Sequence, residues 1–498
     1  MMKIFIWIAT ITIISSCSIK DGKLVKDLVE GEKLASIHCI SCHKYPSPLL
    51  LDKKTWMDQV LPVMAARMGI VENKKSQQSS LELQSVGLFP NKPMISYEDW
   101  AKIKLYYLYN AQTQLNVPKK SLEPKLKLFT KLNVSAKNEI PATSLIKLNE
   151  GEKTFYFGNA NNNNIYLYDL EKGIIDSTNI GGSPSVIIPE GDSLYVLSMG
   201  NIHPNDRYSG FLKLIKSKKE YLILENLPRP VFAQLTDLNG DDLNDFIISG
   251  FGYNLGEFSW YKNKGDHFEK HILKNSPGAI ISEVLDFNSD GNLDIVVLIA
   301  QGNEGIFLYE GDGKGNFKEK TLLSFPPSYG STYFTFFDFN QDGLKDIFYI
   351  NGDNADFESP IMKPYHGVRI YYQKKDHTFE EGFFYHINGA FKGIPEDFDL
   401  DGDIDIAVIS YFPDYENSPE ESFVYLENQG DYDFKAWTND YSTEGKWLIM
   451  EKGDIDLDGD QDLILGSSIL VTNSVPKQLS DQWKQKKQPV MVLINNTK

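Results

Sequence analysis

The 498-residue sequence predicts a multidomain protein in which a small all-α domain is followed by an all-β propeller with seven blades. Three observations lead to this prediction. A C-x-x-C-H motif lies in a helical pattern near the N-terminus, Asp-rich loops of nine residues recur in the C-terminal part, and a short apolar strand follows each loop. Repeats of about 50 residues with about four short strands each are typical of propeller blades.

The composition is that of a folded protein, with 41% hydrophobic and 24% charged residues. A net charge of −18 argues against a nucleic-acid partner, because a phosphate backbone requires a basic surface. The charge is unevenly distributed, since residues 20–140 carry +7 and residues 141–498 carry −26. Three cysteines are too few for a disulfide-rich scaffold.

The N-terminus has the pattern of a secretory signal peptide over residues 1–16. Lys3 precedes an apolar run from Ile4 to Ile14, which is too short to span a bilayer. The following Ser15-Ser16-Cys17 resembles a bacterial lipobox, and this resemblance implies lipidation of Cys17 and a lipidated tether over residues 17–23. Ser18 is not the Asp that favours retention at the inner membrane, so we expect an outer-membrane lipoprotein of the bacterial cell envelope. The alternative is an ordinary signal peptide that contains a cysteine.

Cys39-Ile40-Ser41-Cys42-His43 has the spacing of a covalent haem attachment site. Cys39 and Cys42 would form thioethers with the haem, and His43 would be the proximal iron ligand. A zinc site would need a second cysteine pair, which the sequence does not contain, and a thioredoxin-like dithiol would need a βαβ pattern around the motif. The motif therefore predicts one haem c.

The flanking residues resemble a small single-haem cytochrome c domain over residues 24–112. Gly31 lies where the first helix of such domains carries a glycine that permits close helix contact, and Ser96 begins a capping-box-like start of the last helix. Its expected apolar face comprises Trp100, Ile103, Leu105, Tyr106 and Leu108.

The distal iron ligand is expected to be a methionine, which suits electron transfer. Met64 is favoured because Pro62 can kink or end a helix and so release a nearby side chain. Met94, in a Pro-rich loop before the last helix, is the alternative.

Five nine-residue loops follow, and they start 49, 52, 59 and 57 residues apart. Each carries carboxylate or amide oxygens at positions 1, 3, 5 and 9. These residues are Asp237, Asn239, Asp241 and Asp245; Asp286, Asn288, Asp290 and Asp294; Asp338, Asn340, Asp342 and Asp346; Asp397, Asp399, Asp401 and Asp405; and Asp454, Asp456, Asp458 and Asp462.

Such loops predict calcium sites, because Ca²⁺ prefers six to eight oxygen ligands and position 7 can add its carbonyl. Glycine at position 6 permits the sharp turn. Asp242 replaces it in the first loop, and aspartate tolerates the left-handed conformation better than most residues. A single loop of this kind is more often a solvated turn, but five at near-regular spacing indicate up to about five bound calcium ions.

This region resembles the FG-GAP/VCBS repeat family of calcium-loop propellers, which implies a propeller over residues 125–498 behind a linker at 113–124. At about 51 residues per blade, the length allows seven blades. Two blades without the motif fit before residue 225. The segment Lys125–Val134 is expected to pair with Val490–Ile494 and close the ring.

The expected function is electron transfer by a membrane-anchored c-type cytochrome. The propeller would serve as a platform for a redox or envelope protein, or for a small-molecule or glycan ligand. One alternative is a haem-linked propeller dehydrogenase acting on sugars or alcohols, although the sequence shows no catalytic signature for it. A second alternative is a surface adhesion or scaffold module.

Overall fold

The computed structural model describes residues 19–72, 89–134, 139–356, 361–430, 432–471 and 475–498. The predicted signal peptide and Cys17 lie outside the described residues. The chain divides into two compact units, one of residues 1–41 and 47–114 and one of residues 42–46 and 115–498. Within the described ranges, no helix is long and apolar enough to cross a membrane.

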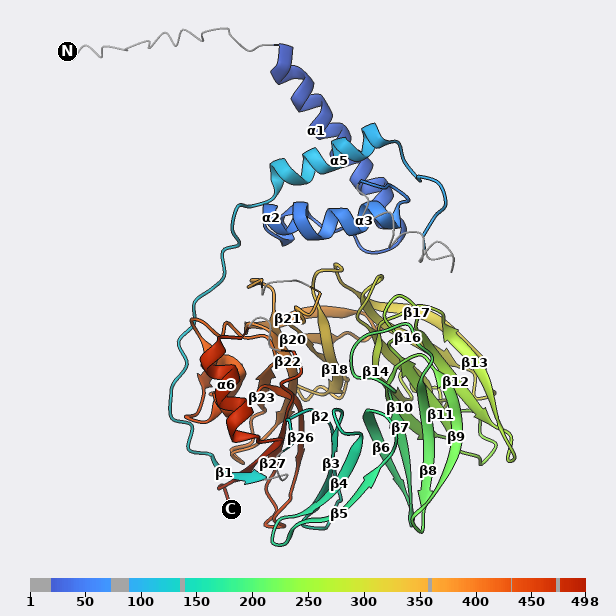
Figure 1. The fold of residues 1–498 in the computed structure, drawn as a ribbon, viewed down its shortest axis with the longest axis vertical. Helices are drawn as coiled ribbons and strands as arrows, with labels where there is room; N and C mark the ends of the chain where they lie inside the picture. Colours follow the sequence, from blue (N-terminus) through green and yellow to red (C-terminus); the bar gives the residue numbers. More distant parts are fainter. Residues whose placement is uncertain (1–18, 73–88, 135–138, 357–360, 431, 472–474) are drawn as a thin grey trace, which may run out of the picture. The chain divides into compact units, whose positions relative to one another are not determined.

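The first unit is helical (Figure 1). Its long helices are α1 (Ile19–His38) and α5 (Tyr97–Asn110), and the segments between them are short. These are η1 (Cys39–Ser41), η2 (Pro48–Leu50), α2 (Lys53–Thr55), the π-helical turn η3 (Trp56–Val60) and α3 (Leu61–Arg67).

Helices α1 and α5 cross at Gly31. A Cβ atom added there would lie 2.2 Å from the carbonyl oxygen of Lys102 and 3.0 Å from Cβ of Tyr106, so a larger residue would push the helices apart. The predicted role of this glycine is confirmed. Packing at this crossing holds α1 against α5 within the first unit.

The N-terminus of α5 and most of its apolar face agree with the prediction. The Ser96 hydroxyl oxygen accepts a hydrogen bond from the Asp99 backbone N–H at 3.0 Å, which caps the helix. Trp100, Ile103 and Tyr106 are buried. Leu108, however, is exposed, and the buried residue is Tyr107, whose ring packs 4.5 Å from that of Trp56. The large aromatic pair selects the helix face that turns inward.

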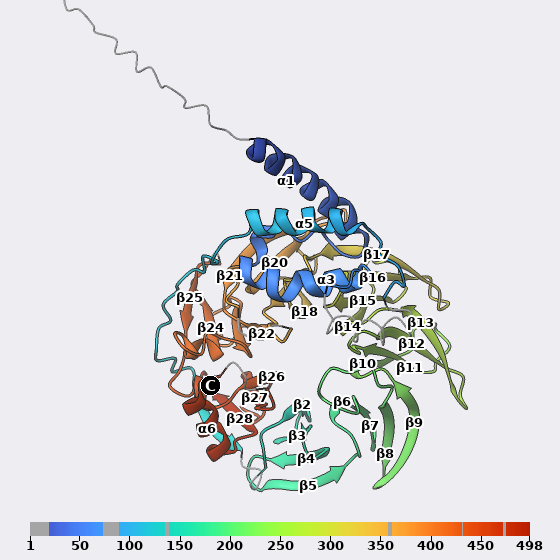
Figure 2. The same ribbon diagram turned by 45° about the horizontal axis from the view of Figure 1, so that its top comes forward.

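The second unit is a seven-bladed β-propeller, in which seven four-stranded antiparallel sheets form a ring (Figure 2). Blade 1 is β2 (Thr143–Leu148), β3 (Thr154–Asn159), β4 (Asn164–Asp169) and β5 (Gly173–Asn179); blade 2 is β6 (Pro184–Glu190), β7 (Ser193–Ser198), β8 (Gly210–Lys216) and β9 (Lys219–Leu227); blade 3 is β10 (Pro230–Thr236), β11 (Asp245–Gly250), β12 (Glu257–Asn263) and β13 (Phe268–Lys274).

The remaining blades follow the same order. Blade 4 is β14 (Ala279–Leu285), β15 (Asp294–Ile299), β16 (Gly305–Gly311) and β17 (Phe317–Ser324); blade 5 is β18 (Ser331–Phe337), β19 (Asp346–Asn351), β20 (Gly367–Gln373) and β21 (Phe379–His386); blade 6 is β22 (Ala390–Glu396), β23 (Asp405–Ser410), β24 (Phe423–Asn428) and β25 (Phe434–Trp437).

Blade 7 joins the two ends of the propeller sequence. Its strands are β26 (Trp447–Gly453), β27 (Asp462–Ser467), β28 (Val490–Asn495) and β1 (Phe129–Val134). Strand β1 pairs antiparallel with β28 from Phe129 opposite Asn495 to Val134 opposite Val490. The predicted closure of the ring is confirmed. Helix α6 (Lys477–Lys486), which the sequence analysis did not anticipate, lies between β27 and β28 along the chain.

The second strand of blades 3 to 7 is buried at every residue, and this burial explains its continuous apolar pattern. Side chains on both faces pack against neighbouring blades, as when Trp260 of blade 3 shares a core with Phe307 of blade 4. Because the strands alternate in direction, the turns between the first and second strands all lie on one face of the ring. The turns between the second and third strands lie on the opposite face.

Candidate functional site

The five Asp-rich loops join the first and second strands of blades 3 to 7 and therefore gather on one face of the propeller. All five share one backbone conformation. The position-1 carboxylate accepts the backbone N–H of position 6 at 2.8–3.1 Å in every loop. The predicted left-handed residue at position 6 is confirmed, including Asp242 at φ 64°.

Position 4 is left-handed as well, which the sequence pattern did not reveal. It is Gly240 in the first loop, but the others place Ser289, Gln341, Leu400 and Leu457 at φ between 56° and 66°. A left-handed conformation costs a non-glycine residue about 1–2 kcal/mol, so the surrounding hydrogen bonds must hold these residues in place.

The position-9 aspartate acts as a staple, which we define as the residue whose carboxylate ties its loop to the third strand. It is fully buried in all five loops. One carboxylate oxygen accepts the backbone N–H of the last residue of the third strand at 2.7–2.9 Å. In four loops the other oxygen accepts the N–H of position 2; in the loop of blade 6, Tyr425 donates to that oxygen of Asp405 instead.

Position 3 divides the loops into two classes. In blades 3 to 5 it is asparagine, whose amide donates to a loop carboxylate at 3.0–3.1 Å: Asn239 to Asp245, Asn288 to Asp290 and Asn340 to Asp342. In blades 6 and 7 it is Asp399 or Asp456, which has no such donor. Each asparagine loop therefore has an internal hydrogen bond from position 3, whereas each aspartate loop places several negatively charged carboxylates close together.

The aspartate loops present oxygen clusters that could hold a cation. Carboxylate oxygens of Asp397, Asp399 and Asp401 lie within 4.8 Å of one another, and those of Asp454, Asp456 and Asp462 do the same. Among the described residues, one buried oxygen each of Asp397, Asp456 and Asp460 has no hydrogen-bond partner. Buried polar oxygens normally have hydrogen-bond donors, and oxygens without donors are suited to coordinate a hard cation.

The raised pKa values of aspartates in these two loops also favour the binding of a cation. Burial raises the pKa of Asp399, and the charges of Asp401 and Asp397 raise it further. Burial likewise raises the pKa of Asp405 and of Asp462 to about 7, although backbone N–H donors oppose the shift. A divalent cation would relieve this repulsion.

Asp460, at position 7 of the last loop, was missed by the sequence analysis, which assigned only a carbonyl ligand to that position. Its side chain is 1% exposed. One carboxylate oxygen accepts the backbone N–H of Lys498 at 3.0 Å. Position 7 is exposed in the loops of blades 3 and 6 and half-buried, at Asn292 and Leu344, in those of blades 4 and 5. The repeat pattern therefore does not indicate that the side chain of Asp460 turns inward.

The C-x-x-C-H segment follows α1 directly. A 3₁₀ turn over Cys39–Ser41 follows the helix and ends just before Cys42. Cys39 is half-buried and Cys42 is exposed. Nδ1 of His43 lies 2.9 Å from the carbonyl oxygen of Lys44, so the tautomer protonated at Nδ1 would direct the Nε2 lone pair to a metal.

The two methionines lie in different surroundings. Met64 is half-buried on α3, directly after the π-helical turn η3, where the N–H of Leu61 bonds to the carbonyl of Trp56. This wider turn accommodates Pro62, which lacks an N–H, so the proline interrupts regular α-helix but does not end it. Met94 is 55% exposed, and its backbone N–H donates to the carbonyl of Met68 at 2.9 Å.

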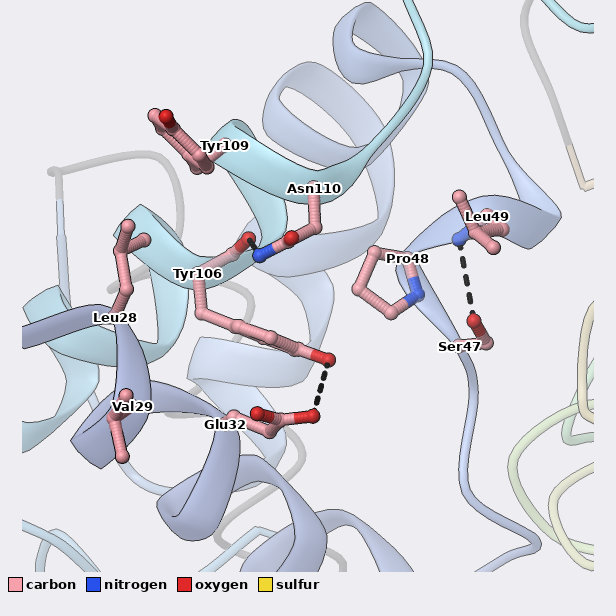
Figure 3. Close-up of a pocket in the computed structure, with 9 residues that line it drawn as sticks. All are labelled: Leu28, Val29, Glu32, Ser47, Pro48, Leu49, Tyr106, Tyr109 and Asn110. Carbon is pink, nitrogen blue, oxygen red and sulfur yellow. Dashed lines mark hydrogen bonds between the residues drawn. The ribbon is translucent and has the colours of Figure 1, made fainter. Parts of the chain in front are cut away.

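A cavity of about 300 Å³ lies between α1, η2 and α5 (Figure 3). The Tyr106 hydroxyl donates to Glu32 at 3.4 Å within it. The lining residues are Leu28, Val29, Glu32, Ser47, Pro48, Leu49, Tyr106, Tyr109 and Asn110. This cavity therefore does not contain the cysteines, histidine or methionines predicted to hold a haem.

Comparisons with known proteins agree with the repeat architecture. Residues 237–297 and 286–349 match the profile of the FG-GAP-like repeat, so the chain contains FG-GAP-like repeats in a seven-bladed propeller. No curated protein sequence matches the chain.

Similar solved structures include Saccharomyces cerevisiae Sqt1, at 9% identity and a TM-score of 0.42, covering 76% of this chain and 100% of that one. A chain of the S. cerevisiae complex of Dbp5 with Nup159, Gle1, IP6 and ADP has 10% identity and a TM-score of 0.41, covering 76% and 96%. An ancestral GH74 enzyme has 10% identity and a TM-score of 0.42; the match covers 68% of this chain and 45% of that one.

The staple makes a prediction that is independent of any metal. Replacing Asp294 with alanine leaves two buried N–H groups, of Phe287 and Gly311, without acceptors and should lower the free energy of unfolding by about 2–4 kcal/mol. Asp290→Ala, at the exposed position 5 of the same loop, should cost less than about 1 kcal/mol. Urea unfolding in chelator measures both values, and equal losses would contradict the staple.

Proposed function

We propose that this protein is a c-type cytochrome of the bacterial cell envelope that carries electrons through one covalently bound haem. The C-x-x-C-H segment at the end of α1 carries the proposal, because it combines two thiols three residues apart with a histidine whose Nδ1 meets a carbonyl oxygen. The close approach of α5 to α1 at Gly31 supports it, since the resemblance to small cytochromes implies a glycine that permits close helix contact.

The residues that would hold the haem are Cys39 and Cys42, through thioethers, and His43, through its Nε2 atom. The haem would supply one-electron chemistry, while the protein sets its potential through the distal ligand and the polarity around it. Met64 remains the favoured distal ligand because its helix packs within the unit, and Met94 remains the alternative.

Covalent haem attachment can be tested with protein produced in a host that has a c-type maturation system. We expect a pyridine haemochrome spectrum of the c type and haem that stays with the chain on a denaturing gel. Cys39→Ala with Cys42→Ala should abolish both signals, because no thioether can form. Ser41→Ala, within the same motif, is the matched control and should retain them.

Haem-free wild-type protein under these conditions would contradict the electron-carrier proposal and favour a scaffold role. In loaded protein, Met64→Leu should alter the reduction potential and the methionine-ligation band, whereas Met94→Leu should leave both unchanged. The opposite result would assign the distal position to Met94.

The FG-GAP propeller is a binding or scaffold platform, and we propose that calcium in its Asp-rich loops stiffens it. All five loops have the required oxygens, but those of blades 6 and 7 already cluster three carboxylates each. These two loops are therefore proposed as the tightest sites. A redox or envelope protein would dock on this platform.

Calcium should raise the melting temperature relative to chelator, because it binds the folded state only. The double variant Asp399→Asn with Asp456→Asn should lose most of this shift while it remains folded, since asparagine occupies the same position in the other three loops. Asn340→Asp provides the reverse control and should increase the calcium response of blade 5. A full calcium shift in the double variant would contradict the assignment to blades 6 and 7.

We also propose that Cys17 carries the lipid that anchors the protein to the outer membrane. The apolar run before Ser15-Ser16-Cys17 supports this. A Cys17→Ser variant should move from the membrane fraction to the soluble fraction of the envelope, and its retention in the membrane fraction would contradict the anchor.

A further inference from the structure

A second cavity, of about 420 Å³, lies on blade 2 at the face of the propeller opposite the Asp-rich loops. It is formed by the loop between β7 and β8 and by the turn that follows β5. The residues that line it are Gly181, Gly200, Asn201, His203, Pro204, Asn205, Arg207 and Ser209. None of the Asp-rich loops or proposed haem ligands contributes to this lining.

The wall of the cavity is held in one conformation by its own hydrogen bonds. Asn201 accepts the N–H of His203 at 2.9 Å, and Asn205 accepts the N–H of Arg207 at 3.0 Å. The guanidinium of half-buried Arg229 donates through Nε to the carbonyl oxygen of Ile202 at 3.1 Å. These contacts pre-order the loop, which lowers the entropic cost of binding a ligand.

The lining contains cationic and neutral groups but no carboxylate. The acidic residue of this loop, Asp206, accepts the backbone N–H groups of Asn254 and Leu255 at 2.6 and 2.7 Å. These hydrogen bonds hold its carboxylate against blade 3, and it is not among the residues that line the cavity. The lining thus carries an arginine and a histidine without an acidic side chain.

The cavity therefore offers polar donors beside glycine and proline surface. The oxygens of Asn201 and Asn205 are used within the loop, which leaves the exposed side chains of His203, Arg207 and Ser209 as donors toward the cavity. Lys213 lies close by, about 4.0 Å from where a Cβ of Gly181 would be, but it pairs with Glu220 at 2.8 Å. Arg207 thus provides the unpaired positive charge among the residues that line the cavity.

We propose that this cavity binds a small organic carboxylate of about the size of an acidic monosaccharide. A guanidinium matches a carboxylate with two parallel hydrogen bonds, and the hydroxyl and imidazole groups can serve the sugar hydroxyls. The volume lies within the range of small-ligand sites. This site adds a specific ligand to the platform and does not depend on haem or on electron transfer.

The test is titration calorimetry of the full chain in calcium-containing buffer, with glucuronate as the probe. Saturable binding is expected, with little binding of glucose, which has the same ring but lacks the carboxylate. Arg207→Ala should weaken the affinity at least tenfold, and Arg207→Lys should weaken it less, because a point charge replaces the planar donor pair. Lys219→Ala, an exposed cation of the same blade outside the cavity, is the matched control and should bind as the wild type does.

Three outcomes would overturn the proposal: no saturable binding of glucuronate, equal binding of glucose, or unchanged affinity in Arg207→Ala. Inorganic phosphate in competition separates a general oxyanion site from a sugar-acid site, and complete displacement by equimolar phosphate would overturn the sugar-acid assignment. The haem spectrum of each variant should be unchanged, so failure of this proposal is distinguishable from failure of the electron-carrier proposal.

Discussion

The propeller depends on one set of backbone hydrogen bonds, those between β1 and β28. This pairing joins residues more than 350 positions apart and leaves blade 7 with four strands like the other six. It supplies the outermost strand of blade 7 from the other end of the propeller sequence, so the pairing ties the two ends of the ring together. The loop of blade 7 reinforces the same junction, since the N–H of Asn495 at the end of β28 donates to Asp462. Ring closure and the Asp-rich loop are therefore parts of one structural unit.

The aspartates of the loops combine two physical roles that the sequence pattern does not distinguish. Position 9 is a buried staple whose oxygens accept backbone N–H groups, so it is required whether or not a cation binds. Positions 1, 3 and 5 lie nearer the solvent and determine the local charge. Where position 3 is asparagine, its amide donates a hydrogen bond to a carboxylate of the same loop. Where it is Asp399 or Asp456, three carboxylates lie close together. The change from an amide nitrogen to a carboxylate oxygen at position 3 thus removes an internal donor and adds a charge, which favours tighter calcium binding in blades 6 and 7.

The proposed activities occupy different parts of the molecule. The haem proposal concerns the segment after α1, the calcium proposal concerns one face of the propeller, and the carboxylate cavity lies on the opposite face. Each rests on a different donor set: thiols with an imidazole, carboxylate oxygens, and a guanidinium with neutral donors. A platform with separate sites is consistent with a propeller, because its rigid blades support many functions through loop variation alone. The strongly acidic C-terminal part reflects mainly these repeated loops.

Much of this fold could be predicted from the sequence because the repeats are recognisable by their near-regular spacing. The five loops, the strands behind them, the two blades without the motif and the pairing of β1 with β28 follow from local patterns and from the need to satisfy sheet edges. The cap at Ser96 was also evident, since capping is a local backbone requirement, and Gly31 indicated a close helix contact whose partner, Lys102 of α5, only the structure shows. The buried face of α5 could not be predicted in full: Tyr107 is buried in place of Leu108 because the choice depends on Trp56, an aromatic ring from a distant segment.

Likewise, only the tertiary structure showed that Asp460 turns inward, that Asp206 accepts hydrogen bonds from blade 3 and that the lining of the blade 2 cavity contains no acidic residue. Sequence patterns determine which groups are available and what backbone they prefer, whereas the partners that bury or neutralise those groups come from elsewhere in the chain and are decided by packing.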